Sequence, residues 1–144
     1  MLLLSIHPVL QSTAILLAFY AAYLGWPRTL SLHFARRTRF DRWRHALLGT
    51  LALTVMMGGT AGGLIVVSRF LHKPILTEVH GKTALVALPF LVLGLVSGIY
   101  LYRYPRPRKV LPSLHAINNL LILLFTLLQG YSGLKLYLWY LSIG

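Results

Sequence analysis

The sequence predicts an all-α membrane protein, a single domain over residues 1–144 that forms an up-down four-helix transmembrane bundle. Hydrophobic residues make up 57% of the chain and charged residues only 11%, with a mean hydropathy of +0.71. That balance is not found in soluble domains. The chain contains four apolar stretches, each long enough to cross a bilayer. Because their connections are short, neighbouring helices are expected to be antiparallel.

The four expected helices cover about residues 2–26, 45–70, 79–102 and 114–141. No Lys or Arg precedes the first stretch, and its apolar part exceeds a signal-peptide core, so we expect a mature helix. Gly25-Trp26-Pro27 is expected to end that helix, and three prolines punctuate the third connection, namely Pro105, Pro107 and Pro112. The fourth stretch is longer than a bilayer needs, which favours a tilt or an interfacial end.

The positive charges predict the orientation of the bundle. Ten of the fourteen basic residues fall in the first and third connections: Arg28, Arg36, Arg37, Arg39, Arg42, Arg44, Arg103, Arg106, Arg108 and Lys109. The positive-inside rule makes these connections cytoplasmic and both termini outer or lumenal. Anionic lipid headgroups account for this charge, and we expect no nucleic acid partner. The prediction is an integral, multi-pass protein of a plasma or thylakoid membrane, surrounded by membrane lipid.

Four histidines share a second regularity, because each is followed by a glycine 18 residues later. The pairs are His7 and Gly25, His45 and Gly63, His80 and Gly98, and His115 and Gly133. Eighteen residues are five helical turns, so each pair lies on one helix face about 27 Å apart. Each helix therefore has a histidine, a common metal ligand, near its start and a glycine, which has no side chain, near its far end.

Antiparallel packing decides which of these histidines can meet. The first and third helices start on the outer side, which places His7 and His80 at one depth, and His45 and His115 share the cytoplasmic depth. In a square bundle both pairs lie on diagonals. Ionisable residues inside membrane segments are usually functional, and imidazole is a good ligand for iron. We therefore predict two bis-histidine haem b sites, with these four histidines as the metal ligands.

Glycines beside these sites are expected to leave room for the cofactor, because glycine has no Cβ that would clash with a ring. The haem-clearance prediction rests chiefly on Gly59, Gly63, Gly94 and Gly98. Gly25 and Gly133 lie near expected helix ends, where glycine is a common terminator. Close helix packing through small residues spaced four apart is an alternative reason for the glycines.

The chain lacks the residues that other classes of chemistry require. The chain has no cysteine, and its acidic residues are Asp41 and Glu78, both near helix ends. A proton pump or transporter would usually need a carboxylate in mid-membrane, and no nucleophile triad, phosphate loop or zinc motif is present. No catalytic residue is predicted. Electron transfer by a cofactor remains, with quinol, a soluble reductant or a partner complex as the electron source.

Two alternatives stay open from the residues alone. One is an accessory or assembly subunit of a larger membrane complex, for example a photosynthetic one, or a homodimer, whose histidines bind chlorophyll or no cofactor. The other is a channel or transporter, for which polar pathway residues are scarce. Measuring haem, chlorophyll and solute flux would separate the three.

The chain resembles the four-helix core of the cytochrome b-561 family. Ile6-His7-Pro8-Val9-Leu10 is similar to the opening of the first core helix of that family. Thr77-Glu78-Val79-His80-Gly81 and Pro112-Ser113-Leu114-His115 are similar to its later ligand helices. The resemblance implies that the first and third helices hold one haem and the second and fourth the other. Six-helix members have a further helix on either side of the core, and their ascorbate-binding positions have no clear match here.

The chain is also similar to a small four-helix family of unassigned function that is common in cyanobacteria. The Arg36-Arg37-Thr38-Arg39 loop and the Gly58 to Gly63 segment carry that similarity. The resemblance to the cytochrome b-561 core implies transmembrane electron transfer.

Overall fold

A computed structural model describes residues 2–70 and 79–143, and side chains within residues 5–65, 79–139 and 141–142. The described residues form four long helices: α1 (Leu2–His33), α2 (Arg42–Phe70), α3 (Val79–Arg103) and α4 (Val110–Ile143). All four contain a segment long and apolar enough to cross a membrane. The prediction of an all-α, four-helix bundle is confirmed.

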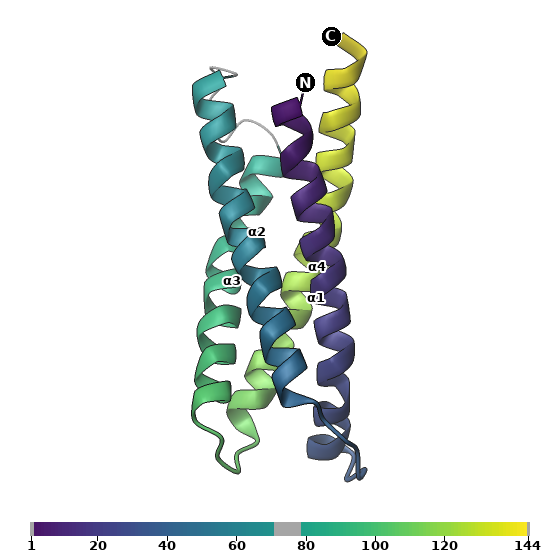
Figure 1. Cartoon of the computed structure of the whole chain (residues 1–144), viewed down its shortest axis with the longest axis vertical. Coiled ribbons are helices and arrows are strands. Elements are labelled where there is room, and N and C mark those ends of the chain that lie inside the picture. The colour runs from purple at the N-terminus through teal and green to yellow at the C-terminus, as the bar shows by residue number, and fades with distance from the viewer. Residues whose placement is uncertain (1, 71–78, 144) are drawn as a thin grey trace.

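The helices run side by side in an up-down arrangement (Figure 1). α1 packs against α2 and α4, and α3 packs against the same two helices, whereas the diagonal pairs α1/α3 and α2/α4 make no close backbone contact. The start of α1 and the end of α4 lie at one end of the bundle, which we call the terminal end. The α1–α2 and α3–α4 connections lie at the other.

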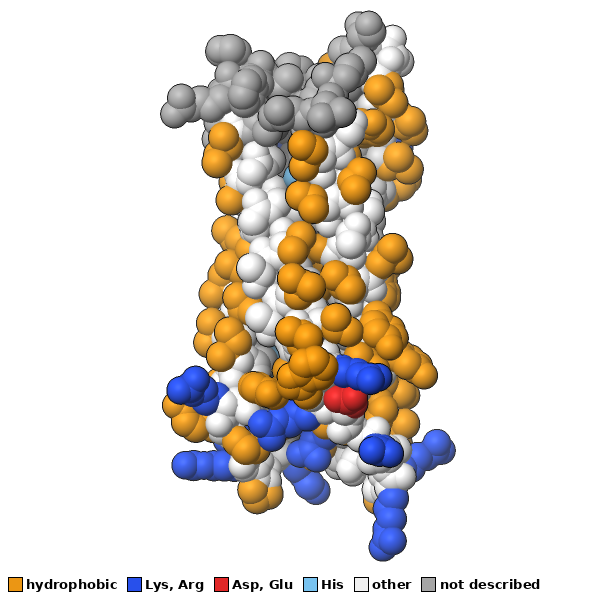
Figure 2. Space-filling view, viewed as in Figure 1, with side chains coloured by type: hydrophobic (Ala, Val, Ile, Leu, Met, Phe, Trp, Pro, Cys, Tyr) orange, Lys and Arg blue, Asp and Glu red, His pale blue; other side chains and the backbone are white. Residues whose placement is uncertain are grey.

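Lys and Arg side chains gather at the end formed by these two connections, which we call the basic end (Figure 2). Hydrophobic side chains cover the shaft between the two ends. Many of them point outward, such as Leu16 at 71% and Leu124 at 52% exposure. Large apolar residues on the outside of a bundle are suited to contact with lipid tails.

The centre of the bundle is narrow because small side chains fill it. Ala14 and Ala52 are fully buried, and Leu53, Met56 and Ile122 pack around them. Small residues let helices approach closely in a membrane, where packing rather than hydrophobic burial drives association. This packed layer lies between the two depths at which the histidines are found.

The end of α1 lies later than the sequence predicts. α1 continues seven residues beyond Trp26, to His33, so Gly25-Trp26-Pro27 does not end it. A proline in the helix removes a single backbone hydrogen bond, which membrane helices tolerate. At the actual end, the N–H groups of Phe34 and Arg36 both donate to the carbonyl of Leu30, and Ala35 adopts the left-handed conformation with φ of 51° that often ends a helix.

The starts of α2 and α4 also lie earlier than predicted. Asp41 caps α2, since its Oδ1 accepts the N–H of Arg44 at 3.0 Å, and the helix then begins at Arg42. α4 begins at Val110, so Pro112 lies in its first turn, where a proline costs no hydrogen bond. α4 then runs to Ile143, and Gly133 is an interior residue of the helix, not a terminator.

Candidate functional site: two histidine pairs on the bundle diagonals

The structure brings the four histidines together in the two predicted pairs. His7 of α1 faces His80 of α3, with ring centres 6.2 Å apart and ring planes at 89°. His45 of α2 faces His115 of α4, also at 6.2 Å, with planes at 82°. The first is the terminal-end pair and the second is the basic-end pair. Each pair spans a diagonal across which the helix backbones themselves do not touch.

The spacing within each pair fits two axial ligands on one metal ion. With imidazole–metal bonds of about 2.0–2.1 Å on opposite sides of an ion, the two ring centres are about 6.3 Å apart. The observed 6.2 Å matches that distance in both pairs. No cluster of three or more His, Cys, Asp or Glu side chains occurs among the described residues. A porphyrin supplies four nitrogen ligands itself, so two histidines complete the coordination of its iron.

Hydrogen bonds fix the orientation of the imidazoles. Nδ1 of His45 lies 2.8 Å from the carbonyl oxygen of Ala21, and His7 makes a hydrogen bond to the backbone of Gly59. A carbonyl only accepts, so Nδ1 of His45 carries the proton and its Nε2 has a free lone pair. This tautomer is the usual one for a histidine that binds metal through Nε2.

In the α3–α4 hairpin the histidine partners include serines that the sequence analysis did not single out. Nδ1 of His115 lies 2.8 Å from the hydroxyl of Ser97, and Nδ1 of His80 lies 3.1 Å from that of Ser132. Both serines immediately precede the paired glycines, as Ser97-Gly98 and Ser132-Gly133. This repeated Ser-Gly dipeptide, 17 and 18 residues after a histidine, is a signal that would have found them.

Side-chain amides form further hydrogen bonds around the two histidine pairs. The Asn119 amide nitrogen donates to the carbonyl of His115 at 2.7 Å and lies 3.2 and 3.3 Å from its two ring nitrogens. The Gln129 amide donates to the carbonyl of His80 at 3.1 Å and to the hydroxyl of Thr83 at 2.6 Å. The Gln129 contacts join α3 to α4 at the level of the terminal-end pair. The Asn119 contacts lie within α4 and stiffen it beside His115.

Glycines lie against the imidazoles in a pattern that links the two helices of each hairpin. A Cβ at Gly63 would lie 3.2 Å from Cε1 of His7, and a Cβ at Gly98 would lie 3.2 Å from Cε1 of His115. Gly25 and Gly133, which the sequence analysis treats as possible terminators, make the corresponding approaches to His45 and His80. Every paired glycine therefore faces the histidine of its antiparallel neighbour.

The other two predicted clearance glycines face different side chains. A Cβ at Gly59 would collide with the side chain of Gln11. A Cβ at Gly94 would lie 2.9 Å from Cδ1 of Ile122 and 3.2 Å from side-chain atoms of Asn118 and Asn119. Their role in leaving room for a haem stays a prediction.

A cavity of about 700 Å³ surrounds the basic-end pair. His45 and His115 line it together with four glycines, Gly25, Gly49, Gly94 and Gly98, and its lining extends to Arg28, Arg42 and Arg106. Its volume is in the range of sites that hold drug-sized ligands and cofactors. The residues present therefore suit a large flat group whose acidic substituents reach the arginines at the rim.

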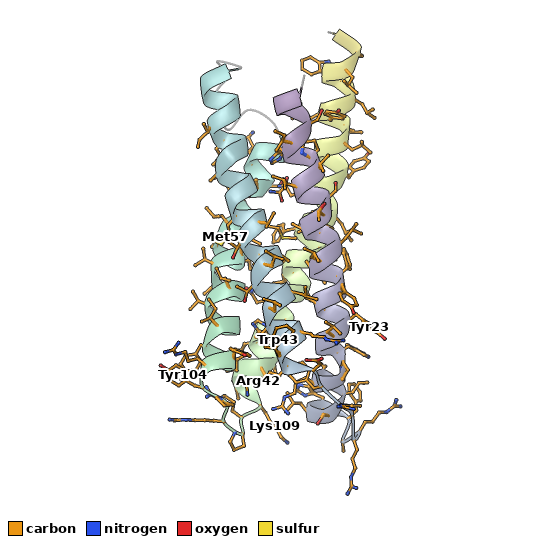
Figure 3. All side chains as sticks on the ribbon, in the orientation of Figure 1. Tyr23, Arg42, Trp43, Met57, Tyr104 and Lys109 are labelled. Atoms are coloured by element: carbon orange, nitrogen blue, oxygen red, sulfur yellow. The ribbon has the colours of Figure 1, made fainter. Side chains whose placement is uncertain are left out.

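An arginine stacked on a tyrosine lies in the lining of this cavity, since the guanidinium carbon of Arg42 is 4.9 Å from the ring centre of Tyr102. A second such contact at the basic end joins Arg108 to Tyr100, at 5.1 Å. Figure 3 places Arg42, Trp43, Tyr104 and Lys109 at this end and Met57 far above it, at mid-height. Cations stacked on aromatic rings are held in place while their charge remains available.

Comparison with known proteins identifies the family. The model of a family described as eukaryotic cytochrome b561 matches residues 6–141, which includes all four histidines. Curated proteins and solved structures gave no significant match. Two diagonal histidine pairs in a four-helix membrane bundle agree with that match. The chain therefore belongs to the cytochrome b561 family and is an integral, multi-pass membrane protein that binds haem b and transfers electrons.

Proposed function

We propose that this protein carries electrons across the membrane through two haem b groups, one held by His7 and His80 and the other by His45 and His115. The observation that carries the proposal is the pair of 6.2 Å imidazole separations at opposite ends of the bundle. Haem b, when bound, supplies reversible one-electron chemistry at its iron.

The residues of the chain have three tasks in this function. The four histidines hold the metal at two fixed depths, and their hydrogen bonds to Ala21, Gly59, Ser97 and Ser132 hold the imidazole rings in place. The apolar layer around Ala14 and Ala52 keeps water from the space between the two depths. Arg28, Arg42 and Arg106 supply positive charge at the rim of one site.

The two histidine pairs are separated along the bundle. The His45 ring contacts α1 between Ala21 and Gly25, which are 14 and 18 residues beyond His7. At 1.5 Å per residue the pairs are about 20–27 Å apart along the helix axes. That separation is most of the thickness of the hydrocarbon core. One redox centre then lies near each membrane surface.

The distribution of charge supports an orientation with the basic end in the cytoplasm and both termini on the outer or lumenal side. His45 and His115 then form the cytoplasmic site and His7 and His80 the outer one. A quinol or a soluble redox partner donates electrons at one surface, and a second partner accepts them at the other. A plasma or thylakoid membrane provides both surfaces.

The proposal is tested by replacing each histidine with alanine and recording reduced-minus-oxidised spectra on purified protein. Each variant should lose one of two haems. His7→Ala and His80→Ala should leave the same residual spectrum and midpoint potential, and His45→Ala and His115→Ala should leave the other. His33→Ala is the matched control, because His33 is exposed and bonds Ser113 rather than a second histidine.

Two results would contradict the proposal. The same residual haem in His7→Ala and His45→Ala would show that the diagonal pairs are wrongly assigned. Wild-type protein that carries chlorophyll and no haem would place the histidines in another kind of site.

A further inference from the structure

Four glycines lie against the four histidines in a reciprocal pattern within each hairpin. In the α1–α2 hairpin, His7 meets Gly63 and His45 meets Gly25, and in the α3–α4 hairpin, His80 meets Gly133 and His115 meets Gly98. The distances from a Cβ at these glycines to Cε1 of the histidine would be 3.2, 2.8, 2.9 and 3.2 Å, respectively. Each is closer than ordinary van der Waals contact between carbon atoms, which is about 3.5–4.0 Å.

Because the imidazole rings lie so close to the glycines, they can form hydrogen bonds to the neighbouring helix. The His45 ring lies against Gly25 and bonds the carbonyl of Ala21, one turn earlier on α1. The His7 ring lies against Gly63 and bonds the backbone of Gly59, again one turn earlier. The His80 ring bonds the backbone of Gln129, which is one turn before Gly133, and the hydroxyl of Ser132. A carbonyl inside a helix is within reach of a neighbouring side chain only where the helix surface is open beside it.

We propose that Gly25, Gly63, Gly98 and Gly133 are positioning residues for the haem ligands. Each leaves a notch in its helix in which the imidazole of the antiparallel neighbour lies, and the wall of the notch supplies the acceptor for Nδ1–H. The notch sets the plane of the ring and the direction of Nε2. This inference rests on the proposed function, because it takes the four histidines as ligands.

The arrangement assigns two glycines to each haem. Gly25 and Gly98 hold the rings of the basic-end pair, and Gly63 and Gly133 hold those of the terminal-end pair. Each pair of ring planes is nearly perpendicular, at 82° and 89°, respectively. Because the two rings of a pair lie in notches on different hairpins, each glycine controls one of the two planes.

Other glycines of the same helices provide controls. A Cβ at Gly58, Gly62 or Gly130 would have no atom within 4 Å. Gly62 immediately precedes Gly63 on α2, and Gly130 lies three residues before Gly133 on α4. A methyl group at these control positions has the same effect on helix propensity and lipid contact without touching a histidine.

The test compares Gly25→Ala, Gly63→Ala, Gly98→Ala and Gly133→Ala with Gly62→Ala and Gly130→Ala in the full-length, haem-loaded protein. Haem content, the midpoint potential of each haem and the electron paramagnetic resonance spectrum of the oxidised protein are measured. The g anisotropy of a low-spin ferric haem depends on the angle between its two axial imidazole planes. This spectrum therefore reports ring orientation directly and does not depend on turnover.

Each paired-glycine variant should change one haem and leave the other as in wild type. Gly25→Ala and Gly98→Ala should alter the signal that His45→Ala removes, and Gly63→Ala and Gly133→Ala the signal that His7→Ala removes. Haem at the affected site should be bound about 10-fold or more weakly, as for other groups that orient a metal ligand. Gly25→Ala and Gly133→Ala should have the larger effects, because their approaches of 2.8 and 2.9 Å are the shorter ones.

The outcomes separate this inference from the proposed function. Loss of both haems together, or the same change in Gly62→Ala as in Gly63→Ala, would overturn the positioning role and indicate general destabilisation of the bundle. Unchanged spectra in all four variants would also overturn it while leaving the two haem sites intact. Wild-type protein without two haems would instead contradict the proposed function.

Discussion

The two histidines of each pair have different hydrogen-bond partners, one on the backbone and one a serine hydroxyl. His45 bonds a backbone carbonyl, whereas Nδ1 of His115 lies 2.8 Å from the hydroxyl of Ser97. The Ser97 hydroxyl proton is directed to the carbonyls of Leu93 and Gly94, so its lone pairs face the imidazole. An acceptor at Nδ1–H makes a histidine a more basic ligand, which favours the ferric state.

Ser97→Ala should therefore raise the midpoint potential of the haem at the basic-end pair. Loss of a hydrogen bond worth ~1 kcal/mol corresponds to about 40 mV for one electron. Potentiometric titration of the purified protein measures the change, and the haem held by His7 and His80 should keep its potential. Ser142→Ala is the control, because Ser142 is exposed and bonds the carbonyl of Trp139. An unchanged or lowered potential in Ser97→Ala would contradict the role of the hydroxyl.

Sequence reasoning predicted which histidines meet but not what the glycines touch. The pairing follows from helix direction alone, because antiparallel helices place His7 with His80 and His45 with His115. The contact of Gly25 with His45 depends on the register between α1 and α2, and a glycine spacing within one helix does not define that register. The serines were missed because a hydroxyl in a membrane helix usually bonds its own backbone, as Thr13 does to Val9.

The four expected spans are present as helices, but α1 ends later than predicted and α2 and α4 begin earlier. α3 ends at Arg103, within one residue of the predicted end. α1 extends past Pro27 and ends just before Ala35, which takes the left-handed conformation. Glycine is the residue that usually marks such a position in a sequence, so an alanine there gave no sign of the helix end. The hydroxyl of Thr38 also donates to the carbonyl of Pro27 at 2.6 Å and holds the connection against the helix. Caps of this kind depend on backbone conformation more than on residue type.

The α1–α2 interface depends on a close fit between Gln11 and Gly59. The Gln11 amide reaches the carbonyls of Val55 and Met56 at 3.5 and 3.4 Å and fills the space where a Cβ at Gly59 would lie. Gly59→Ala should therefore destabilise the bundle by about 1–3 kcal/mol through overpacking. Thermal unfolding in detergent, followed by circular dichroism, measures this loss.

A second substitution, at Gln11, tests whether the loss comes from the collision between Gln11 and a Cβ at Gly59. Gln11→Ala removes the colliding atoms, so the double variant Gly59→Ala/Gln11→Ala should unfold close to the temperature of Gln11→Ala alone. Gly58→Ala should unfold as wild type, because a Cβ there meets no atom within 4 Å. Additive losses in the double variant would show that Gly59 has another role, such as the predicted clearance for haem.

The whole molecule consists of two similar hairpins, α1–α2 and α3–α4, each with two histidines and two paired glycines. Every glycine contact lies within a hairpin, whereas every histidine pair joins one hairpin to the other. A metal held by either pair would therefore connect the two hairpins. The same arrangement of two histidines and two glycines occurs at both ends of the bundle.

The proposed orientation places the basic end in the cytoplasm. The chain has no cysteine, so single cysteines are available as unambiguous reporters. In intact cells, a membrane-impermeant thiol reagent should label Ser142→Cys at the terminal end and leave Arg37→Cys at the basic end unlabelled. Permeabilised cells, in which both positions should react, are the control. Labelling of Arg37→Cys from outside would reverse the orientation and exchange the outer and cytoplasmic sites.

The proposed function requires that the bundle holds two haems on its diagonals. The most direct measurement is the molar ratio of haem b to polypeptide in the purified wild-type protein, from the haemochrome spectrum and amino-acid quantitation. Two imidazole pairs with ring centres 6.2 Å apart predict a ratio of two. A ratio of one in fully loaded protein would contradict the transmembrane route, and a ratio of zero would contradict the assignment of the histidines as haem ligands.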